Sequence, residues 1–359
     1  MKKSWIIVCL AIPFLSKAQS DTSTLRVHLS GYAEVYYGFD FGRPTAANRP
    51  GFVYSHNRHN EFNINIAFLK SSVNAARFRA NLALMAGTYA NANLAAEPGT
   101  LRNILEANAG IKLSKKTDLW LDAGIFSSHI GFESAIGKDC WTLTRSMAAD
   151  NSPYYESGAK LTYASANSHW VFSALALNGW QRIQRPPGNN SLGGGWQIQY
   201  KPNKRVLLNS STFLGNDKPD EERRMRVFHN LYGIFQFSDQ FGLILGLDTG
   251  WEAPEYKGKE TRFWYSPVAI ARYAWNKRLA LALRGEYYAD KTGVIIATDT
   301  PNGFQTLGLS LNLDVQIHQN ALWRIEGKWW NSRDAVFLDA QGQPSYANSV
   351  LTTALSVGF

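Results

Sequence analysis

Two short stretches of the sequence carry residue types that could do chemistry. The first, HNRHNE, contains His56, His59 and Glu61, and imidazole and carboxylate groups are common zinc ligands. On a helix the two histidines would converge. This stretch instead leads from a loop into a strand-like segment, where residues three apart point to opposite faces. The favoured interpretation is a polar loop base, so we expect neither a metal site nor a cofactor.

The second stretch carries groups that hydrolysis would need. Ser127, Ser128 and His129 are adjacent in the sequence. Asp139 follows closely, so a nucleophile, a base and an orienting carboxylate are all present. Neighbours in a loop rarely form such a triad, and loop packing is the favoured interpretation. Gly193–Gly195 lack the Lys-Ser/Thr that follows a phosphate-binding loop, and they indicate close packing or a bulge. We expect no enzyme.

The charged residues lie in segments where apolar and polar residues alternate. In LGLSLNLDVQI (residues 307–317) the large apolar residues take every second position, and the last ten residues follow the same rule. A period of two places alternate side chains on opposite faces of a strand. By this rule we expect the apolar residues of EFNINIAF to share one face: Phe62, Ile64, Ile66 and Phe68.

The connections between these segments sort into short and long. Short polar turns, such as Asn74–Arg77, alternate with long loops, of which Ser127–Pro153 is the longest. A soluble sandwich has no reason to sort its loops in this way, whereas an outer-membrane barrel does. The last segment would be an exposed edge unless it paired with the first. We therefore predict an all-β fold: a transmembrane outer-membrane antiparallel β-barrel of about sixteen strands, with short periplasmic turns and long extracellular loops.

The start of the chain has the features of a secretory signal peptide. Two lysines precede the apolar run Trp5–Leu15, and a small-x-small cleavage site follows at residues 16–18. The run is too short for a bilayer-spanning helix, which needs about 20 residues. We predict a signal peptide over residues 1–18 and a single transmembrane β-barrel over residues 19–359. Cys140 would then be the only cysteine of the mature chain, which excludes an internal disulfide.

The formal net charge of +9 does not indicate a nucleic-acid partner. Much of the basic excess sits in short turns, as at Lys115 and Lys116, and scattered turn lysines form no groove. The polar faces of the predicted strands carry both signs in near balance, as a hydrated pore requires. The expected pore-lining residues are Glu34, Glu61, Arg79, Glu106, Lys112, Asp122, Glu156, Lys160, Arg272, Arg284, Glu286, Asp314, Arg324, Glu326 and Lys328.

Several segments resemble a known family. Residues 51–70, 79–99, 119–163 and 177–185 are similar to the OmpL-like β-barrel porins of Gram-negative bacteria. The resemblance implies a pore-forming barrel in the cell outer membrane, with membrane lipid and small hydrophilic solutes as partners. The terminal Phe359 resembles the signal that barrel insertion machinery reads. Solute specificity, ion selectivity and oligomeric state are left open.

We therefore expect a porin, a water-filled channel for passive diffusion of small hydrophilic solutes. A barrel of about sixteen strands is wide enough for an aqueous channel, whereas about eight strands would be filled by side chains. Two alternatives share the same alternation: an outer-membrane barrel enzyme of lipase or protease type, and a non-conducting structural or adhesin barrel. Current across a planar bilayer separates the channel from both.

The longest loop is too apolar to lie free in water. Ile130, Phe132 and Trp141 need burial, and folding into the lumen would supply a wall to pack on. The third loop of general sixteen-strand porins narrows the pore in this way, and the position here is similar. We predict that the loop forms the constriction, through Glu133, Lys138, Asp139 and Arg145. An apolar cap over the barrel rim is the alternative.

Overall fold

The predicted barrel is confirmed in a computed structural model that describes residues 25–254 and 262–359. Within these residues sixteen antiparallel strands form one closed barrel, in the order β1-β18-β15-β14-β13-β12-β11-β10-β9-β8-β7-β6-β5-β4-β3-β2. Consecutive barrel strands pair with each other, β18 pairs with β1 to close the barrel, and β16 and β17 form a separate hairpin. The predicted signal peptide, residues 1–18, lies outside the described residues.

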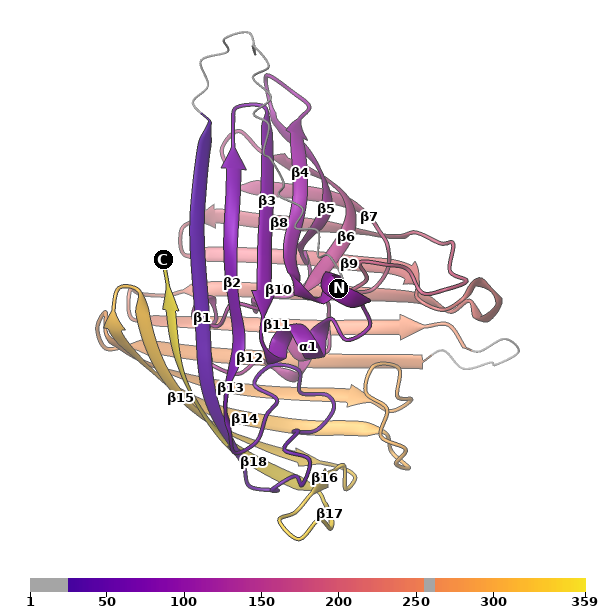
Figure 1. Ribbon diagram of the computed structural model, residues 1–359, viewed down its shortest axis with the longest axis vertical. Helices are drawn as coiled ribbons and strands as arrows, with labels where there is room; N and C mark the ends of the chain where they lie inside the picture. The colour runs from indigo at the N-terminus through magenta and orange to yellow at the C-terminus, as the bar shows by residue number, and fades with distance from the viewer. Residues whose placement is uncertain (1–24, 255–261) are drawn as a thin grey trace, which may run out of the picture.

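The barrel strands are long enough to cross a bilayer at a tilt. Their bounds are β1 (Arg26–Asp40), β2 (Phe62–Asn74), β3 (Phe78–Ala86), β4 (Ile104–Lys112), β5 (Asp118–Ser127), β6 (Tyr155–Ala164), β7 (Trp170–Leu177), β8 (Gly193–Asn203), β9 (Val206–Asn216), β10 (Met225–Gln236), β11 (Phe241–Glu252), β12 (Arg262–Ala274), β13 (Leu279–Asp290), β14 (Phe304–His318), β15 (Ala321–Ser332) and β18 (Ala347–Gly358). In Figure 1 the strands β1–β3 run nearly at right angles to β10–β13 of the other wall. Strands tilted by about 35–45° to the barrel axis give this crossing when two walls are viewed through each other.

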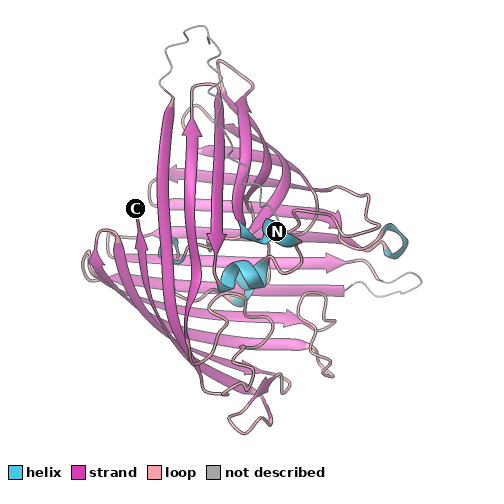
Figure 2. Ribbon diagram, viewed as in Figure 1, coloured by secondary structure: helices cyan, strands magenta, loops and turns pink. Residues whose placement is uncertain are grey.

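Helices occur only as short pieces in the connections of the described chain, as Figure 2 shows. The remaining elements are α1 (Thr88–Asn93), η1 (Gly99–Asn103), η2 (Gly137–Asp139), α2 (Met147–Asp150), η3 (Asp220–Glu222), β16 (Phe337–Leu338) and β17 (Pro344–Ser345). None of the helices in residues 25–254 and 262–359 has the length and apolar character to span a membrane.

The alternation of the sequence becomes two faces of the barrel wall. On β14, Leu307, Leu309 and Leu311 are exposed on the outside, while Ser310 and Asn312 between them are buried inside. Water would penalise a surface of exposed leucines, but bilayer lipid solvates it. The outer face is therefore the lipid face, and the polar inner face surrounds the lumen.

One predicted face assignment is wrong, and a β-bulge explains it. The pairing of β1 with β2 slips at Asn65, so that Glu34 faces Ile66 while Val35 faces Ile64. Phe62 and Ile64 are exposed to lipid as expected, but Ile66 is fully buried and Phe68 packs against the same inner cluster beside Tyr32. A single extra residue moves every later side chain of a strand to the opposite face. Asn65 uses its new position to donate to the Glu34 carboxylate at 2.9 Å.

The barrel closes at its last strand, as the sequence predicts. β18 pairs with β1 over residues 350–358, and Gly31 and Phe359 then exchange two backbone hydrogen bonds of 3.0 Å. The Phe359 side chain stays 74% exposed on the lipid face and lies against Gly31, where a Cβ atom would meet its ring at 2.5 Å. Recognition of Phe359 by insertion machinery stays a prediction.

Candidate functional site

The long loop between β5 and β6, here called L3 (residues 128–154), lies inside the barrel. It leaves the wall near β9 and β10, where His129 contacts the Thr212 carbonyl at 2.7 Å and Gly131 donates to Asn230. It then reaches the middle of β14, where the Leu143 amide donates to Asn312 at 3.0 Å. A cap on the rim would not reach residues at the centre of a strand, so L3 crosses the lumen.

Buried charges of the wall hold L3 in place. Arg284 lies 2.9 Å from Glu326, and the two groups bind the backbone and hydroxyl of Thr144. Lys328 pairs with Glu286 at 2.7 Å. These four wall residues are at most 5% exposed. Because their ionic and backbone partners lie within hydrogen-bond reach, the network satisfies charges that would be costly to bury alone.

The same network extends along the loop. Arg324 pairs with Asp314 at 2.6 Å and donates to the carbonyls of Gly137 and Cys140. The Lys328 ammonium donates to the Arg145 carbonyl at 3.0 Å. Wall side chains thus bind the loop mainly through its backbone, which fixes the path of L3 more than the identity of its side chains.

Three inward-facing glycines make room for side chains of L3. A Cβ atom on Gly246 would lie 2.5 Å from the Phe132 ring, and one on Gly242 would lie 2.6 Å from Trp141. A Cβ atom on Gly195 would lie 2.9 Å from His129. The predicted close packing at Gly193–Gly195 therefore has a definite neighbour. The sequence does not predict these contacts, because a glycine in a strand does not indicate which loop will pack against it.

The four predicted constriction residues fall into two kinds. The side chains of Glu133 and Arg145 are buried: Glu133 accepts from Ser146, and Arg145 donates to the Ser134 and Leu143 carbonyls. Burial raises the pKa of the Glu133 carboxyl, and the nearby Arg284 guanidinium opposes this shift. Both residues hold L3 together from within.

Lys138 and Asp139 differ from that buried pair. Their side chains are 48% and 46% exposed and form an ion pair of 2.7 Å at the tip of L3. The Lys138 amide donates to Tyr32 of β1, so this tip lies beside the β1 wall. Of the four residues, these two present charge to water.

The loop between β1 and β2, here called L1 (residues 41–61), also folds inward. His56 is fully buried and lies 2.9 Å from the Glu34 carboxylate of β1. His59 accepts from the Asp40 amide at 2.9 Å, while Glu61 pairs with Arg58. The histidines and Glu61 therefore serve different partners. The described ranges contain no group of three or more His, Cys, Asp or Glu residues arranged to hold a metal ion.

The possible hydrolytic triad does not assemble. Ser128 donates to Glu156, and the two ring nitrogens of His129 face the Glu156 carboxylate at 2.8 Å and the Thr212 carbonyl. Because each ring nitrogen is already engaged by one of these groups, neither is free to act as a base for a serine. Burial also raises the pKa of the Cys140 thiol, which makes that cysteine a poor nucleophile.

The wall formed by β2–β6 keeps several of its polar side chains partly accessible. Lys70 pairs with Glu106 at 2.6 Å, and Arg79 binds Asp122 at 2.7 Å. The side chains of Lys70 and Arg79 are 27% and 31% exposed. Asn81 joins Ser72 and Asn108 in a ladder of amide and hydroxyl groups. The partly accessible residues Lys70, Ser72, Arg79, Asn81, Glu106 and Asn108 are called the open arc below.

The predicted pore-lining residues fall into a buried group and a group of intermediate exposure. All except Glu61, which directly precedes β2, lie within barrel strands. Those buried against L1, L3 or the wall are Glu34, Asp122, Glu156, Arg284, Glu286, Asp314, Arg324, Glu326 and Lys328. Those of intermediate exposure are Arg79, Glu106, Lys112, Lys160 and Arg272. Most of the buried set therefore anchors loops.

The closed barrel, its lipid face and its loop-filled lumen define an outer-membrane β-barrel of the porin class. Residues 26–359 match the family model described as "Putative beta-barrel porin-2, OmpL-like", and the chain belongs to that family. This confirms the resemblance noted above and the outer-membrane location. No curated protein matches the sequence.

Solved porin structures share the fold at low sequence identity. The anion-selective porin from Comamonas acidovorans aligns with a TM-score of 0.60 and 10% identity, over 94% of this chain and all of that one (100%). The outer membrane channel DcaP of Acinetobacter baumannii aligns with a TM-score of 0.56 and 9% identity, over 96% and 100%. OmpT, an outer-membrane protein of Vibrio cholerae, aligns with a TM-score of 0.60 and 7% identity, over 95% of this chain and 99% of that one. These similarities show the common fold alone.

Proposed function

We propose that the protein is a channel through which small hydrophilic solutes diffuse passively, and that L3 forms its constriction. The supporting observation is the division of the lumen. L3 is anchored by buried charges to the wall of β13–β15, while the open arc of β2–β6 keeps half-exposed polar groups. Partly exposed charges inside a barrel require water around them, and that water is the route of a hydrophilic solute.

The proposal gives Lys138 and Asp139 the role of setting the electric field at the constriction. They are the two predicted constriction residues whose charges reach water, and they lie at the border between L3 and β1. Glu133 and Arg145 take the role of keeping the loop in shape. This division narrows the original set of four residues to two that a passing ion would meet.

Passive conduction needs no catalytic group. The Ser128 and His129 side chains are engaged by Glu156 and the Thr212 carbonyl, so no observation favours the enzyme alternative. A non-conducting adhesin barrel would not need the hydrated side chains of the open arc. The porin family membership supports a channel without naming its solute.

Planar-bilayer recording of the pure, refolded protein tests the proposal. We expect discrete conductance steps and a reversal potential, measured in a salt gradient, that moves toward cations in Lys138→Glu. Asp139→Lys should move it in the opposite direction. Lys115→Glu, in a periplasmic turn, is the matched charge control and should leave the reversal potential within error of wild type. Folded protein that inserts but carries no current would refute the channel.

A further inference from the structure

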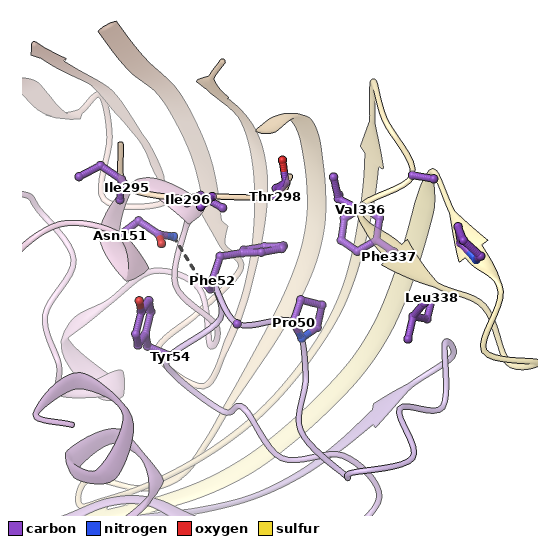
Figure 3. A pocket seen from close by; sticks show the side chains of 14 residues that line it. Pro50, Phe52, Tyr54, Asn151, Ile295, Ile296, Thr298, Val336, Phe337 and Leu338 are labelled. Carbon is purple, nitrogen blue, oxygen red and sulfur yellow. Dashed lines mark hydrogen bonds between the residues drawn. The ribbon is translucent and has the colours of Figure 1, made fainter. Parts of the chain in front are cut away.

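A pocket of about 500 Å³ lies among four loops at the extracellular mouth of the barrel (Figure 3). Most of its wall comes from three loops: residues 50–52 and 54 of L1, residues 295–298 between β13 and β14, and residues 335–338 between β15 and β18. Asn151 of L3 completes it. The pocket is open to solvent on the side that outside solutes reach first, and its volume suits a small organic molecule.

The lining of this pocket is uncharged, and most of its side chains are apolar. Among the described residues that line it, the large apolar side chains are Pro50, Phe52, Ile295, Ile296, Val336, Phe337, Leu338 and Pro344, and none of the lining residues is an acid or a base. The centre of the lumen, in contrast, is dominated by buried ion pairs. A charged solute would lose hydration in this pocket without gaining a counter-charge, so the lining selects against it.

Aromatic rings form a fixed floor. The Phe52 ring lies 4.7 Å from Phe304 and 6.1 Å from Phe337, and Phe337 stacks with Trp330 at an interplanar angle of 14°. Figure 3 places Phe52 between Ile296 and Phe337. The Phe52 ring is tilted by 57° against Phe304 and by 65° against Phe337, so the rings form an apolar corner into which a ring of the solute can pack.

Hydrogen bonds hold the walls in position before any solute arrives. The Asp290 carboxylate accepts from the amides of residues 294–296 at 2.7–2.9 Å. Asn302 donates twice to Asp334, which joins the two loops beside the pocket. Asn151 donates to the Phe52 carbonyl at 3.1 Å, as the dashed line of Figure 3 shows. A wall arranged in advance lowers the ordering cost of binding.

A hydroxyl group stands at the side of this apolar surface. Tyr54 lines the pocket, and within the described part of the chain its hydroxyl makes no hydrogen bond to the protein. The Thr298 hydroxyl, also in the lining, bonds to Thr300 at 2.9 Å. The Tyr54 group can therefore donate to, or accept from, a polar group carried by a bound solute.

We propose that this pocket binds an uncharged solute with a flat apolar ring and hydroxyl groups, of which an aryl glycoside is an example. The ring would pack into the apolar corner at Phe52 and Phe337, and a hydroxyl would pair with Tyr54. The inference rests on the proposed function in one respect: the pocket then concentrates such solutes at the entrance of the channel.

Equilibrium dialysis against the protein in lipid nanodiscs tests the pocket without requiring conduction. The probe is p-nitrophenyl β-glucoside. Methyl β-glucoside keeps the sugar and lacks the ring, and p-nitrophenyl phosphate keeps the ring and adds charge. We expect both to bind at least about 10-fold more weakly than the probe, a factor that corresponds to about 1.4 kcal/mol.

Matched variants locate the binding. Val336→Lys places a charge in the lining and should weaken probe binding at least about 10-fold. Ala340→Lys adds the same charge at an exposed position of the same loop outside the lining, and should leave it unchanged. Leu338→Lys, at a lining residue already 52% exposed, repeats the test if Val336→Lys misfolds. Tyr54→Phe should weaken binding about 3-fold, as the loss of one neutral hydrogen bond does.

Two results would overturn the inference. One is wild-type protein that takes up no more probe than empty nanodiscs. The other is a dissociation constant that neither lysine in the lining changes. Either result leaves the channel proposal to its own bilayer recording. A protein that binds the probe but carries no current would instead refute the channel and retain the pocket.

Discussion

The two sides of the lumen wall carry similar residues and use them differently. On β13–β15, Arg284 and Glu326 are fully covered by L3 and bind its backbone. On β2–β6, Arg79 and Lys70 form ion pairs of similar length but stay partly exposed. The difference comes from the loop. Covered charges become anchors whose loss leaves a partner buried, whereas open charges stay hydrated and are available to a solute.

The largest expected effect comes from breaking the covered side. Arg284→Ala removes the partner of three buried carboxylates, Glu133, Glu286 and Glu326. Removing one member of a buried ionic network costs about 3–5 kcal/mol. Urea unfolding in lipid vesicles, followed by tryptophan fluorescence, should show that loss, with trypsin cleavage after Lys138 reporting release of L3.

Lys70→Ala is the matched change on the open arc. The Lys70 and Glu106 side chains are 27% and 15% exposed, so water can solvate the carboxylate left behind, and we expect a loss below about 1 kcal/mol. Equal losses for Arg284→Ala and Lys70→Ala would show that the two sides do not differ as described.

The next effect separates the lipid face from the lumen face. Leu82 is 52% exposed at the centre of β3, and Asn81 beside it belongs to the open arc. Leu82→Arg puts a charge near the bilayer midplane and should cost about 2–4 kcal/mol. Asn81→Arg should cost little. The shift of the folded band in a heat-modifiability gel compares the two, and similar behaviour would contradict the face assignment.

The choice of strand matters for this comparison. Leu311 and Asn312 of β14 have the same alternation, but Asn312 is fully buried and accepts from the Leu143 amide. Asn312→Arg would displace L3, so it is not a neutral control. The open arc allows a substitution toward the lumen that tests the face alone.

A smaller effect tests the fit between L3 and the wall. Gly246→Val would push against the Phe132 ring, and overpacking of this kind costs about 1–3 kcal/mol. Gly327→Val is the matched control, because a Cβ atom there meets nothing within 4 Å. The urea midpoint in vesicles should fall for Gly246→Val and stay near wild type for Gly327→Val. A reversed order would mean that Phe132 does not rest on Gly246.

The sequence predicts the barrel well because its signal is local. Alternation, loop length and the terminal strand each follow from neighbouring residues, and the closure of β1 on β18 follows from them. The bulge at Asn65 escaped this reasoning, since an extra residue is visible only in the pairing with Glu34. Ile66 therefore moved from the predicted lipid face to the lumen face.

The candidate site was less accessible to sequence reasoning. The apolar residues of L3 indicate burial, but they do not say which wall covers them. Glu133 and Arg145 carry charges like Lys138 and Asp139, yet only the folded loop shows that the first pair binds Ser146 and backbone carbonyls. The inward fold of L1 around His56 was also missed, because its partner Glu34 is a strand residue of ordinary appearance.

Single-channel conductance with and without L3 tests the central claim most directly. Deleting residues 131–148 removes the part of the loop that crosses the lumen and exposes Arg284, Glu326 and Lys328 to water. We predict a folded variant whose single-channel conductance is clearly larger than that of wild type. A variant that inserts normally and keeps the wild-type conductance and reversal potential would contradict the assignment of L3 as the constriction.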